Sequence, residues 1–323
     1  DTQFTTQDLA LSLDMFSDRV LKPAVAAIAN KIDRDGLNMA MLQTANIVGT
    51  AGTPPTGLIT YLTAGAYLDS EGAPRDGRRA VVVEPFTSAT IVDSLKGLFV
   101  PQEAIGEQYR KGLMGRDSAG VNWKLDQNVV SQQFGSFSGT AVCNTSTATG
   151  FLTSGWASTS TISLTATGTI SLNAGDVFTI AGVYAVNPQT RESTGSLQQF
   201  TVTAATSGSS TATLSISPAL YTADQALATV NAFPQASAVV TMVGSAATSY
   251  AQNLVYHKDA ITFATADLLL PQGVDMAARA VHNGISLRVV RQYDINNDRM
   301  PCRIDVLYGY STIRPQMACR IWG

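Results

Sequence analysis

The sequence predicts an α+β protein in which an all-β segment is inserted between a helix-rich N-terminal part and a strand-rich C-terminal part. Residues 139–255 carry only four formally charged side chains, yet apolar and hydroxyl residues alternate through much of this segment. Alternation with a period of two is typical of strands with one buried and one solvated face. Because helical patterns precede the segment and strand patterns follow it, the two flanks are predicted to share one sheet in a discontinuous domain.

Charge is sparse along the whole chain. Of its 323 residues 14% are charged, and the formal net charge is −3, whereas about 25% of residues are charged in a typical soluble domain. The chain is long enough for two domains, because single cores stop growing at about 250–300 residues. A surface with so few charged side chains raises little electrostatic barrier to close packing with neighbouring molecules. It also has no overall basic field to attract DNA phosphates. The composition favours an assembly subunit over a freely diffusing enzyme.

A long helix is predicted over residues 6–35. Thr6 can cap its first turn, and apolar residues follow at steps of three and four. These residues are Leu9, Leu13, Phe16, Val20, Ala24, Ile28 and Ile32. Gly36 is the predicted stop. Since Pro23 lies within the pattern, we expect either a bend there or the end of one helix and the start of another.

The region between this helix and the β-rich segment is predicted to mix helices with a strand. A turn signal at residues 53–55 precedes these elements, and a loop rich in Gly, Pro and Asp covers residues 71–77. In chain order we expect a helix at 57–68, a buried strand at 80–83, and helices at 88–98 and 102–113.

Strand patterns return after the β-rich segment. We expect strands at 260–265, 285–293, 302–310 and 317–322. The loop 294–300 is predicted to join two of them as a long hairpin. Turn-forming clusters such as 135–139 and 207–210 bound the strands of the β-rich segment.

No catalytic, cofactor-binding or metal-binding residue is predicted. The two histidines, His257 and His282, are not near a recognisable nucleophile motif, and both are interpreted as structural. Residues 135–139 read GSFSG, which places Phe137 where a nucleophilic serine would be needed. The sequence contains no GxxxxGKS/T loop, HExxH helix or strand-following GxGxxG motif.

One acidic stretch has a spacing similar to that of a calcium-binding loop. It comprises Asp294, Asn296, Asp298 and Asp305, but Arg299 stands where an EF-hand needs glycine. Both flanks have strand patterns rather than helical ones. We therefore expect a hydrated hairpin loop whose Asp and Asn side chains accept hydrogen bonds from nearby backbone amides.

Two charged clusters each leave two interpretations open. The first contains Asp33, Arg34 and Asp35, and the second contains Arg75, Asp76, Arg78 and Arg79. The first is either a polar site at a helix end or a solvated last turn. The second is either an exposed turn or an electrostatic contact with a neighbouring subunit.

The cysteines are predicted to be free thiols in a reducing compartment. Cys143, Cys302 and Cys319 have no pairwise spacing typical of a metal knuckle or a redox CxxC motif. No run of eighteen apolar residues occurs, so no membrane partner is predicted.

Four stretches of the sequence resemble the coat proteins of the P22-like tailed bacteriophages. They are residues 16–33 (FSDRVLKPAVAAIANKID), 171–204 (SLNAGDVFTIAGVYAVNPQTRESTGSLQQFTVTA), 252–271 (QNLVYHKDAITFATADLLLP) and 284–321 (GISLRVVRQYDINNDRMPCRIDVLYGYSTIRPQMACRI). The first is similar to the long spine helix of that family and the second to its inserted β-barrel domain. Together the stretches follow the family's order over most of the chain.

This resemblance implies the HK97-type capsid fold, with a spine helix, peripheral and axial domains and an inserted antiparallel β-barrel. The implied domains are 1–136 for the spine helix and the first part of the axial and peripheral core, 137–249 for the inserted barrel, and 250–323 for the return strands that complete the core. The family carries no catalytic activity, cofactor or metal that could be transferred to positions of this sequence.

The implied function is that of a major capsid protein that self-assembles into hexamers and pentamers of an icosahedral shell enclosing double-stranded DNA. The implied partners are further copies of the chain, scaffolding and portal proteins, and packaged DNA bound without sequence specificity. The implied location is the virion, assembled in the bacterial host cytoplasm. Family members carry an N-terminal arm and an extended loop before the spine helix. This sequence starts almost at the spine and without Met, so we expect those elements to be absent, removed or outside it.

Two other classes stay open at this point. A virion-associated glycan-binding protein or polysaccharide hydrolase could use the β-rich segment, but hydrolysis needs paired acids that flank a cleft. That segment offers only Asp176, Glu192 and Asp224 for this role. A monomeric binding module displayed on a virion or cell is the other class. Self-association would distinguish a capsid subunit from both.

Overall fold

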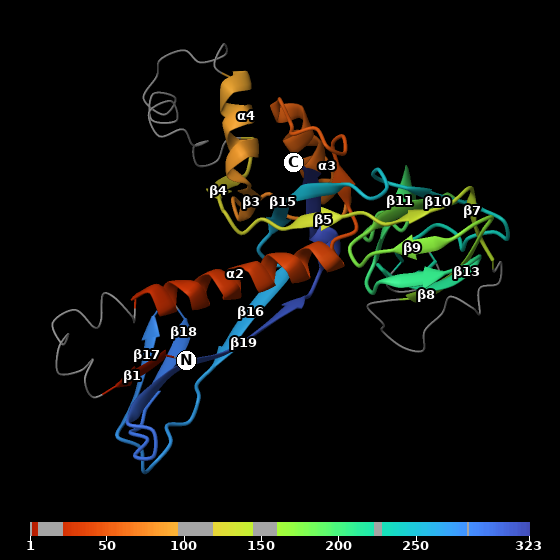
Figure 1. Cartoon of the computed structure of the whole chain (residues 1–323). Coiled ribbons are helices and arrows are strands. Elements are labelled where there is room, and N and C mark those ends of the chain that lie inside the picture. The colour runs from red at the N-terminus through yellow and green to blue at the C-terminus, as the bar shows by residue number, and fades with distance from the viewer. Residues whose placement is uncertain (1, 6–21, 96–118, 145–159, 223–227, 283) are drawn as a thin grey trace. The chain divides into compact units, whose positions relative to one another are not determined.

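The computed structural model describes residues 2–5, 22–95, 119–144, 160–222, 228–282 and 284–323 (Figure 1). The chain divides into two compact units. The first unit contains Asp1–Gly36 and Thr262–Ser311, and the second contains Leu37–Ile261 and Thr312–Gly323. The described parts hold three α-helices and many more strands, so the protein is a mixed α/β protein composed mostly of strands.

The first unit is built on a five-stranded sheet crossed by a helix (Figure 1). The strand order is β1-β19-β18-β17, and β16 also pairs with β19. The strands are β1 (Thr2–Thr5), β16 (Ile261–Ala266), β17 (Met276–His282), β18 (Ile285–Arg291) and β19 (Arg299–Thr312). Strands β18 and β19 are antiparallel, with Arg291 opposite Cys302, and Asp294 bridges to Arg299 in the connection. This confirms the predicted long hairpin.

Helix α2 (Lys22–Gln43) does not stop at Gly36 as predicted. The glycine instead permits close packing, because a Cβ at this position would lie 2.8 Å from Cζ of Tyr310 in β19. The Tyr310 hydroxyl donates a hydrogen bond to the carbonyl of Ile32 at 2.9 Å, which fixes the ring against the helix. Glycine in this helix therefore serves a contact rather than a C-terminal cap.

The N-terminal end of α2 bears on the expectation at Pro23. In the described part of the chain the helix begins at Lys22, so Pro23 is its second residue. The residues before Lys22 lie outside the described part of the chain, so both expectations for Pro23 stay predictions. The predicted cap at Thr6 and the apolar residues from Leu9 to Val20 lie outside the described residues.

The second unit contains a six-stranded central sheet of order β2-β20-β15-β3-β4, with β5 paired to β15. The strands are β2 (Ile47–Val48), β3 (Arg79–Val83), β4 (Asn122–Leu125), β5 (Ser131–Gln133), β15 (Ser249–His257) and β20 (Ala318–Trp322). Strand β2 is parallel to β20 and β3 to β4, whereas the other pairs are antiparallel. Strand β3 is buried at every position, as its apolar run predicts.

Helices α3 (Leu58–Ser70) and α4 (Pro85–Leu95) accompany this sheet. Tyr61, Ala64 and Leu68 of α3 are buried in a cluster with β3, β15 and β20. Helix α4 starts three residues earlier than predicted, because Pro85 is well suited to a first helical position. A short 3-10 helix, η5 (Pro315–Met317), precedes β20. The helix predicted at 102–113 lies outside the described residues.

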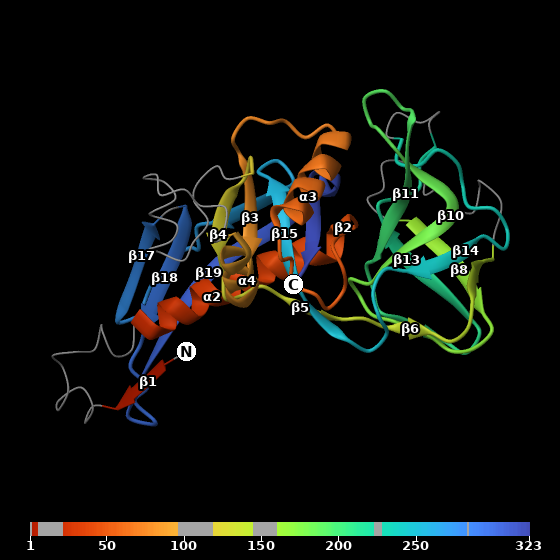
Figure 2. The ribbon, with the colours of Figure 1, turned by 90° about the horizontal axis from the view of Figure 1, so that it is seen from above.

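Strands of the β-rich segment close into a barrel of order β10-β11-β13-β8-β7-β14 (Figure 2). The strands are β7 (Ala141–Cys143), β8 (Ser160–Ala166), β10 (Val177–Val186), β11 (Ser193–Val202), β13 (Thr211–Ser217) and β14 (Val239–Met242), and every neighbouring pair is antiparallel. A small sheet of β6 (Ser136–Phe137), β9 (Ile170–Leu172) and β12 (Thr206–Gly208) accompanies them.

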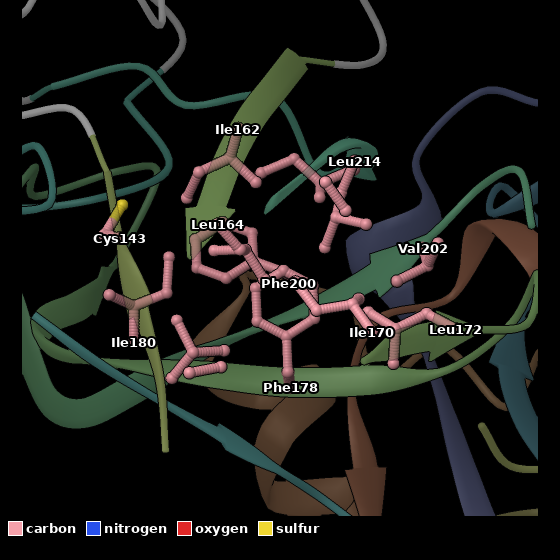
Figure 3. Packing of buried hydrophobic residues seen from close by; sticks show 14 of the residues in the cluster. Cys143, Ile162, Leu164, Ile170, Leu172, Phe178, Ile180, Phe200, Val202 and Leu214 are labelled. Atoms are coloured by element: carbon pink, nitrogen blue, oxygen red, sulfur yellow. The ribbon is translucent and has the colours of Figure 1, made fainter. Parts of the chain in front are cut away.

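The barrel interior is filled by the apolar half of the alternating pattern (Figure 3). In β13, Leu214 and Ile216 are buried whereas Thr213 between Ala212 and Leu214 is exposed. The rings of Phe178 and Phe200 lie at the centre with centroids 5.8 Å apart. Complete burial of such side chains contributes about 1.5–3 kcal/mol each. The core therefore explains how a segment with so little charge stays folded.

Candidate functional site

His257 lies in a hydrogen-bonded cluster rather than beside a nucleophile. Its side chain is fully buried, and its Nε2 lies 3.1 Å from Oδ1 of Asp76. Its Nδ1 accepts a hydrogen bond from the amide of Asp259 at 3.3 Å, which assigns the ring proton to Nε2. Desolvation opposes ionisation of Asp76, but hydrogen bonds from His257 and from the Arg78 amide lower the pKa of this carboxyl. His282 is exposed at the end of β17.

The charged cluster at residues 75–79 forms ion pairs within the chain, and the interpretation as a contact with a neighbouring subunit stays a prediction. Arg79 is buried, and its Nη2 donates to Oδ1 of Asp69 and to the carbonyl of Ala73, both at 2.6 Å. Arg75 also binds Asp69, and its hydrogen bond is the main cause that lowers the pKa of this carboxyl. Arg79 thus belongs to the fold, whereas Arg75 and Arg78 have exposed side chains that pair with Asp69 and Asp76 at the surface.

The cluster at residues 33–35 is not at a helix end, because α2 continues beyond it. Asp35 accepts hydrogen bonds from Nζ of Lys31 at 2.6 Å and from the hydroxyl of Tyr308 at 2.7 Å. These bonds, the one from Lys31 first, lower the pKa of Asp35. Asp35 therefore connects the helix to β19 within the first unit.

The loop at residues 294–300 is a turn stabilised by its own side chains. Asp294 accepts hydrogen bonds from the amide of Asn296 at 3.0 Å and from Nδ2 of Asn297 at 2.8 Å. Asp305, the last position of the would-be calcium loop, is instead bound by Arg288 and Arg303. The prediction of a hairpin loop with local Asx bonds is confirmed. Among the residues with described positions, no group of three His, Cys, Asp or Glu side chains could hold a metal ion.

The two described acids of the β-rich segment do not form a pair. Asp176 is fully buried just before β10, whereas Glu192 is exposed just before β11. They lie at opposite ends of a hairpin whose strands have ten residues, which corresponds to roughly 30 Å. Asp224 is outside the described residues. Asp176 and Glu192 therefore cannot act together across one glycosidic bond.

Asp176 instead belongs to a buried polar junction between the barrel and the central sheet, which we call the Asp176 junction. Its Oδ2 accepts hydrogen bonds from the amides of Asn173 at 2.8 Å and Gly135 at 3.0 Å. Its Oδ1 accepts one from Nε2 of Gln132 at 3.2 Å. Burial raises the pKa of Asp176, although the amide hydrogen bonds oppose the shift.

Arg320 of β20 supplies the positive charge of the Asp176 junction. It is fully buried, and its Nη1 donates to the carbonyl of Gly175 at 2.9 Å. Burial lowers the pKa of Arg320 to about 10, while the charge of Asp176 opposes that shift. Nε and Nη2 of Arg320 have no hydrogen-bond partner among the described residues, so its charge attracts Asp176 without an ion pair. The hydrogen bond to Gly175 joins β20 of the central sheet to the residues just before barrel strand β10.

Further polar bonds join the barrel to the central region. The amide of Ile47 in β2 donates to Oε1 of Gln199 at 2.6 Å, and Nε2 of Gln199 donates to the Ile47 carbonyl at 3.1 Å. Nδ2 of Asn187 donates to the carbonyl of Ser70 at the end of α3 at 2.8 Å. No role was predicted from the sequence for Gln199, Asn187 or Arg320. Of these three, only Arg320 stands out in the sequence, because it is the one charged residue in the apolar run ACRIW.

The GSFSG stretch has a packing role in the second unit. A Cβ on Gly135 would collide with the backbone of Ser171 and Leu172, so the glycine allows the chain to pass close to β9. Phe137 packs against the barrel core. The three cysteines are buried and form no disulfide, and burial raises the pKa of the Cys319 thiol. The reducing compartment stays a prediction.

Large apolar side chains are exposed on both units, which suits a subunit that packs against neighbours. In the first unit they include Leu269 (85% exposed), Val281 (60%) and Ile295 (80%). In the second unit they include Ile59 (72%), Phe86 (79%) and Ile313 (62%). No helix in the described parts of the chain has the length and hydropathy to cross a membrane.

Comparison with known proteins identifies the family. The family described as P22 coat protein, gene protein 5, matches residues 1–323, the whole of the chain. A major capsid protein of Acyrthosiphon pisum secondary endosymbiont phage 1 is 21% identical over 333 residues, covering 99% of this chain and 78% of that relative. Neither match supports a glycan-binding protein or hydrolase. The chain belongs to the P22 coat protein family of structural proteins and is a phage major capsid protein.

Proposed function

We propose that copies of this chain assemble as hexamers and pentamers into an icosahedral shell that encloses double-stranded DNA. The observation that carries this proposal is the family match over the whole chain. The charge-poor composition and the exposed apolar side chains on both units support it, because they permit close packing between many copies. In a closed shell, many weak contacts give large stability through symmetry and multivalency.

The proposed fold is the HK97-type capsid fold with an inserted antiparallel β-barrel. The support for a spine helix is α2, whose 22 residues correspond to roughly 33 Å and whose residues up to Gly36 pack on the sheet of the first unit through Tyr308 and Tyr310. We propose domains 1–136, 137–249 and 250–323 as core, insert and returning strands. The closed barrel, whose strands fall between Ala141 and Met242, supports the insert boundaries.

Its further partners are proposed to be scaffolding and portal proteins and the packaged DNA, which it would contact without sequence specificity. The net charge of −3 argues against a general affinity for phosphates. Assembly would take place in the cytoplasm of the bacterial host, and the mature location would be the virion. The protein would have no catalytic role.

Sedimentation velocity and electron microscopy test the proposal. The chain is produced together with the scaffolding protein of its own phage, and the particles are purified and imaged. We expect closed shells or discrete capsomers. If the chain sediments only as a species near 34.0 kDa over a wide concentration range, the proposed assembly is wrong.

A further inference from the structure

Two cavities lie side by side in the second unit. Their volumes are about 320 Å³ and 240 Å³. Three residues line both of them, namely Asn46, Glu71 and Gln198. The rest of the larger wall is mainly apolar and includes Pro188, Pro218, Ala219, Tyr221, Ile313 and Pro315. A cavity of this size can hold a small organic group.

The shared wall presents hydrogen-bond acceptors. Asn46 and Gln198 are buried, and their amide nitrogens are already used: Nδ2 of Asn46 donates to the carbonyl of Gln316 at 3.4 Å, and Nε2 of Gln198 donates to that of Gln199 at 2.8 Å. Their carbonyl oxygens stay available as acceptors. Glu71 adds a half-buried carboxylate, which forms no ion pair with any residue of the described chain.

Such a carboxylate needs a positive charge or a proton. Burial raises the pKa of Glu71 from its ordinary value to about 7, because desolvation disfavours the charged carboxylate. The other charged group that lines the larger cavity is Arg314, which is exposed and forms no ion pair with Glu71. A cation that enters the cavity would therefore gain a charge-assisted hydrogen bond that the fold does not supply.

We propose that Asn46, Glu71 and Gln198 bind a primary alkylammonium ion whose alkyl chain occupies the larger cavity. An ammonium group has three N–H donors and no acceptor, which matches three oxygen acceptors on one wall. The prolines and Ile313 give the methylene groups an apolar surface. Arg314 places positive charge at the same cavity, so a monoamine should bind better than a diamine of equal length.

Titration of the purified chain with n-butylammonium chloride tests this proposal by calorimetry at pH 8, in buffer without amines. Sodium and tetramethylammonium chloride at equal ionic strength, and 1,4-diaminobutane, are the comparison ligands. The test variant is Glu71→Gln, and Asp298→Asn, which removes an exposed acid of the first unit, is the control. We expect saturable binding to the unsubstituted chain and the control, and binding weaker by about tenfold or more in Glu71→Gln.

Two results would overturn the proposal: no saturable butylammonium binding, or equal affinity of Glu71→Gln and the unsubstituted chain. A second measurement needs no variant. Because the ammonium ion binds the ionised carboxylate, its affinity for the unsubstituted chain should fall between pH 8 and pH 6. An affinity that is constant over this range would contradict the role given to Glu71.

The bound ammonium group could belong to a free amine or to a lysine side chain of another copy of the chain. Carbodiimide cross-linking of assembled particles, followed by peptide mass spectrometry, separates the two sources. A Glu71–lysine cross-link between copies identifies lysine as the occupant. Butylammonium binding to assembled particles without such a cross-link identifies a free amine, and each result supports the site.

Discussion

The side chain of Gln199 completes the outer edge of β2 by binding both backbone groups of Ile47. The amide of Ile47 donates to Oε1 at 2.6 Å, and Nε2 donates to the carbonyl at 3.1 Å. The other edge of β2 is occupied by β20. An unpaired strand edge is a template for unwanted pairing with another chain. A single glutamine from the barrel therefore protects this edge and also ties the barrel to the central sheet.

Replacing Gln199 by alanine should destabilise the chain by about 1–3 kcal/mol, because two backbone groups of Ile47 lose their partners. The measurement is urea unfolding of the unassembled subunit. Gln235→Ala, at an exposed glutamine of the same region, is the control and should change the free energy of unfolding by less than about 0.5 kcal/mol. Equal effects of the two substitutions would show that the Ile47 bonds contribute nothing.

Two helical glycines should respond in opposite ways to alanine. Gly65 in α3 has no atom within 4 Å of an added Cβ, so Gly65→Ala should stabilise by about 0.5–1 kcal/mol. Gly36→Ala should not stabilise the chain and should lower its free energy of unfolding if the ring cannot move, because the added methyl group would meet the Tyr310 ring. That ring is held by its hydrogen bond to Ile32 and by Phe263, whose ring centroid is 4.9 Å away. Thermal melting of both variants is the measurement. A Gly36→Ala variant as stable as Gly65→Ala would refute the close contact.

The Asp176 junction should show strong coupling. Arg320→Met removes the hydrogen bond to the Gly175 carbonyl and the attraction that its charge exerts on buried Asp176, and it should cost about 1–3 kcal/mol; Asp176→Asn weakens the amide hydrogen bonds and should also cost about 1–3 kcal/mol. In the double variant the loss should be smaller than the sum, since neither charge is then left alone. Arg191→Met, at an exposed arginine, is the control. Chemical unfolding of the unsubstituted chain, the two single variants and the double variant gives the coupling energy between Asp176 and Arg320. Strict additivity would mean that the two charges do not interact.

Glu71 should make stability depend on pH. Its pKa is raised from 4.5 to about 7 in the folded chain, so folding favours the protonated form. The stabilising effect is present below pH 4.5 and is lost as the pH rises through 7. Between pH 5 and pH 8 the unsubstituted chain should therefore lose about 1–3 kcal/mol relative to Glu71→Gln. Urea unfolding in buffers without amines measures this difference, and a constant difference would rule out the shift.

Removal of residues 137–249 tests the proposed insert. Gln132 and Tyr250, which both remain after the excision, are register partners, so a short glycine–serine turn can join the cut ends. The remaining core should fold but be much less stable or misassemble, because Ile47, Arg320 and the aromatic cluster of Phe134, Tyr250 and Trp322 lose contacts with the barrel side. Thermal melting and electron microscopy are the measurements. Normal shells with unchanged thermal stability would show that the insert does not have this role.

The sequence alone determined the elements whose periodicity is strong. Alternation along residues 139–255 predicted strands because burial of one face requires a period of two, and the hairpin of β18 and β19 followed from two strand patterns around an Asx-rich turn. The apolar run of β3 predicted its burial. Strand β17 was missed, and β15 was predicted only as the end of the alternating segment, without bounds of its own. Buried Gln252 and Asn253 interrupt the apolar pattern of β15, and β17 is rich in alanine, which has low strand propensity.

The tertiary structure decided which contacts form between segments that are far apart in the chain. Gly36 reads as a helix stop until Tyr310, 274 residues later, occupies the space where its side chain would be. Arg320, Gln199 and Glu71 acquire their roles only through partners or cavities formed by distant segments. Periodicity reports which face of a segment is buried, but the hydrogen bonds and charges of a buried junction depend on the register between segments. A single sequence does not contain that register in any local pattern.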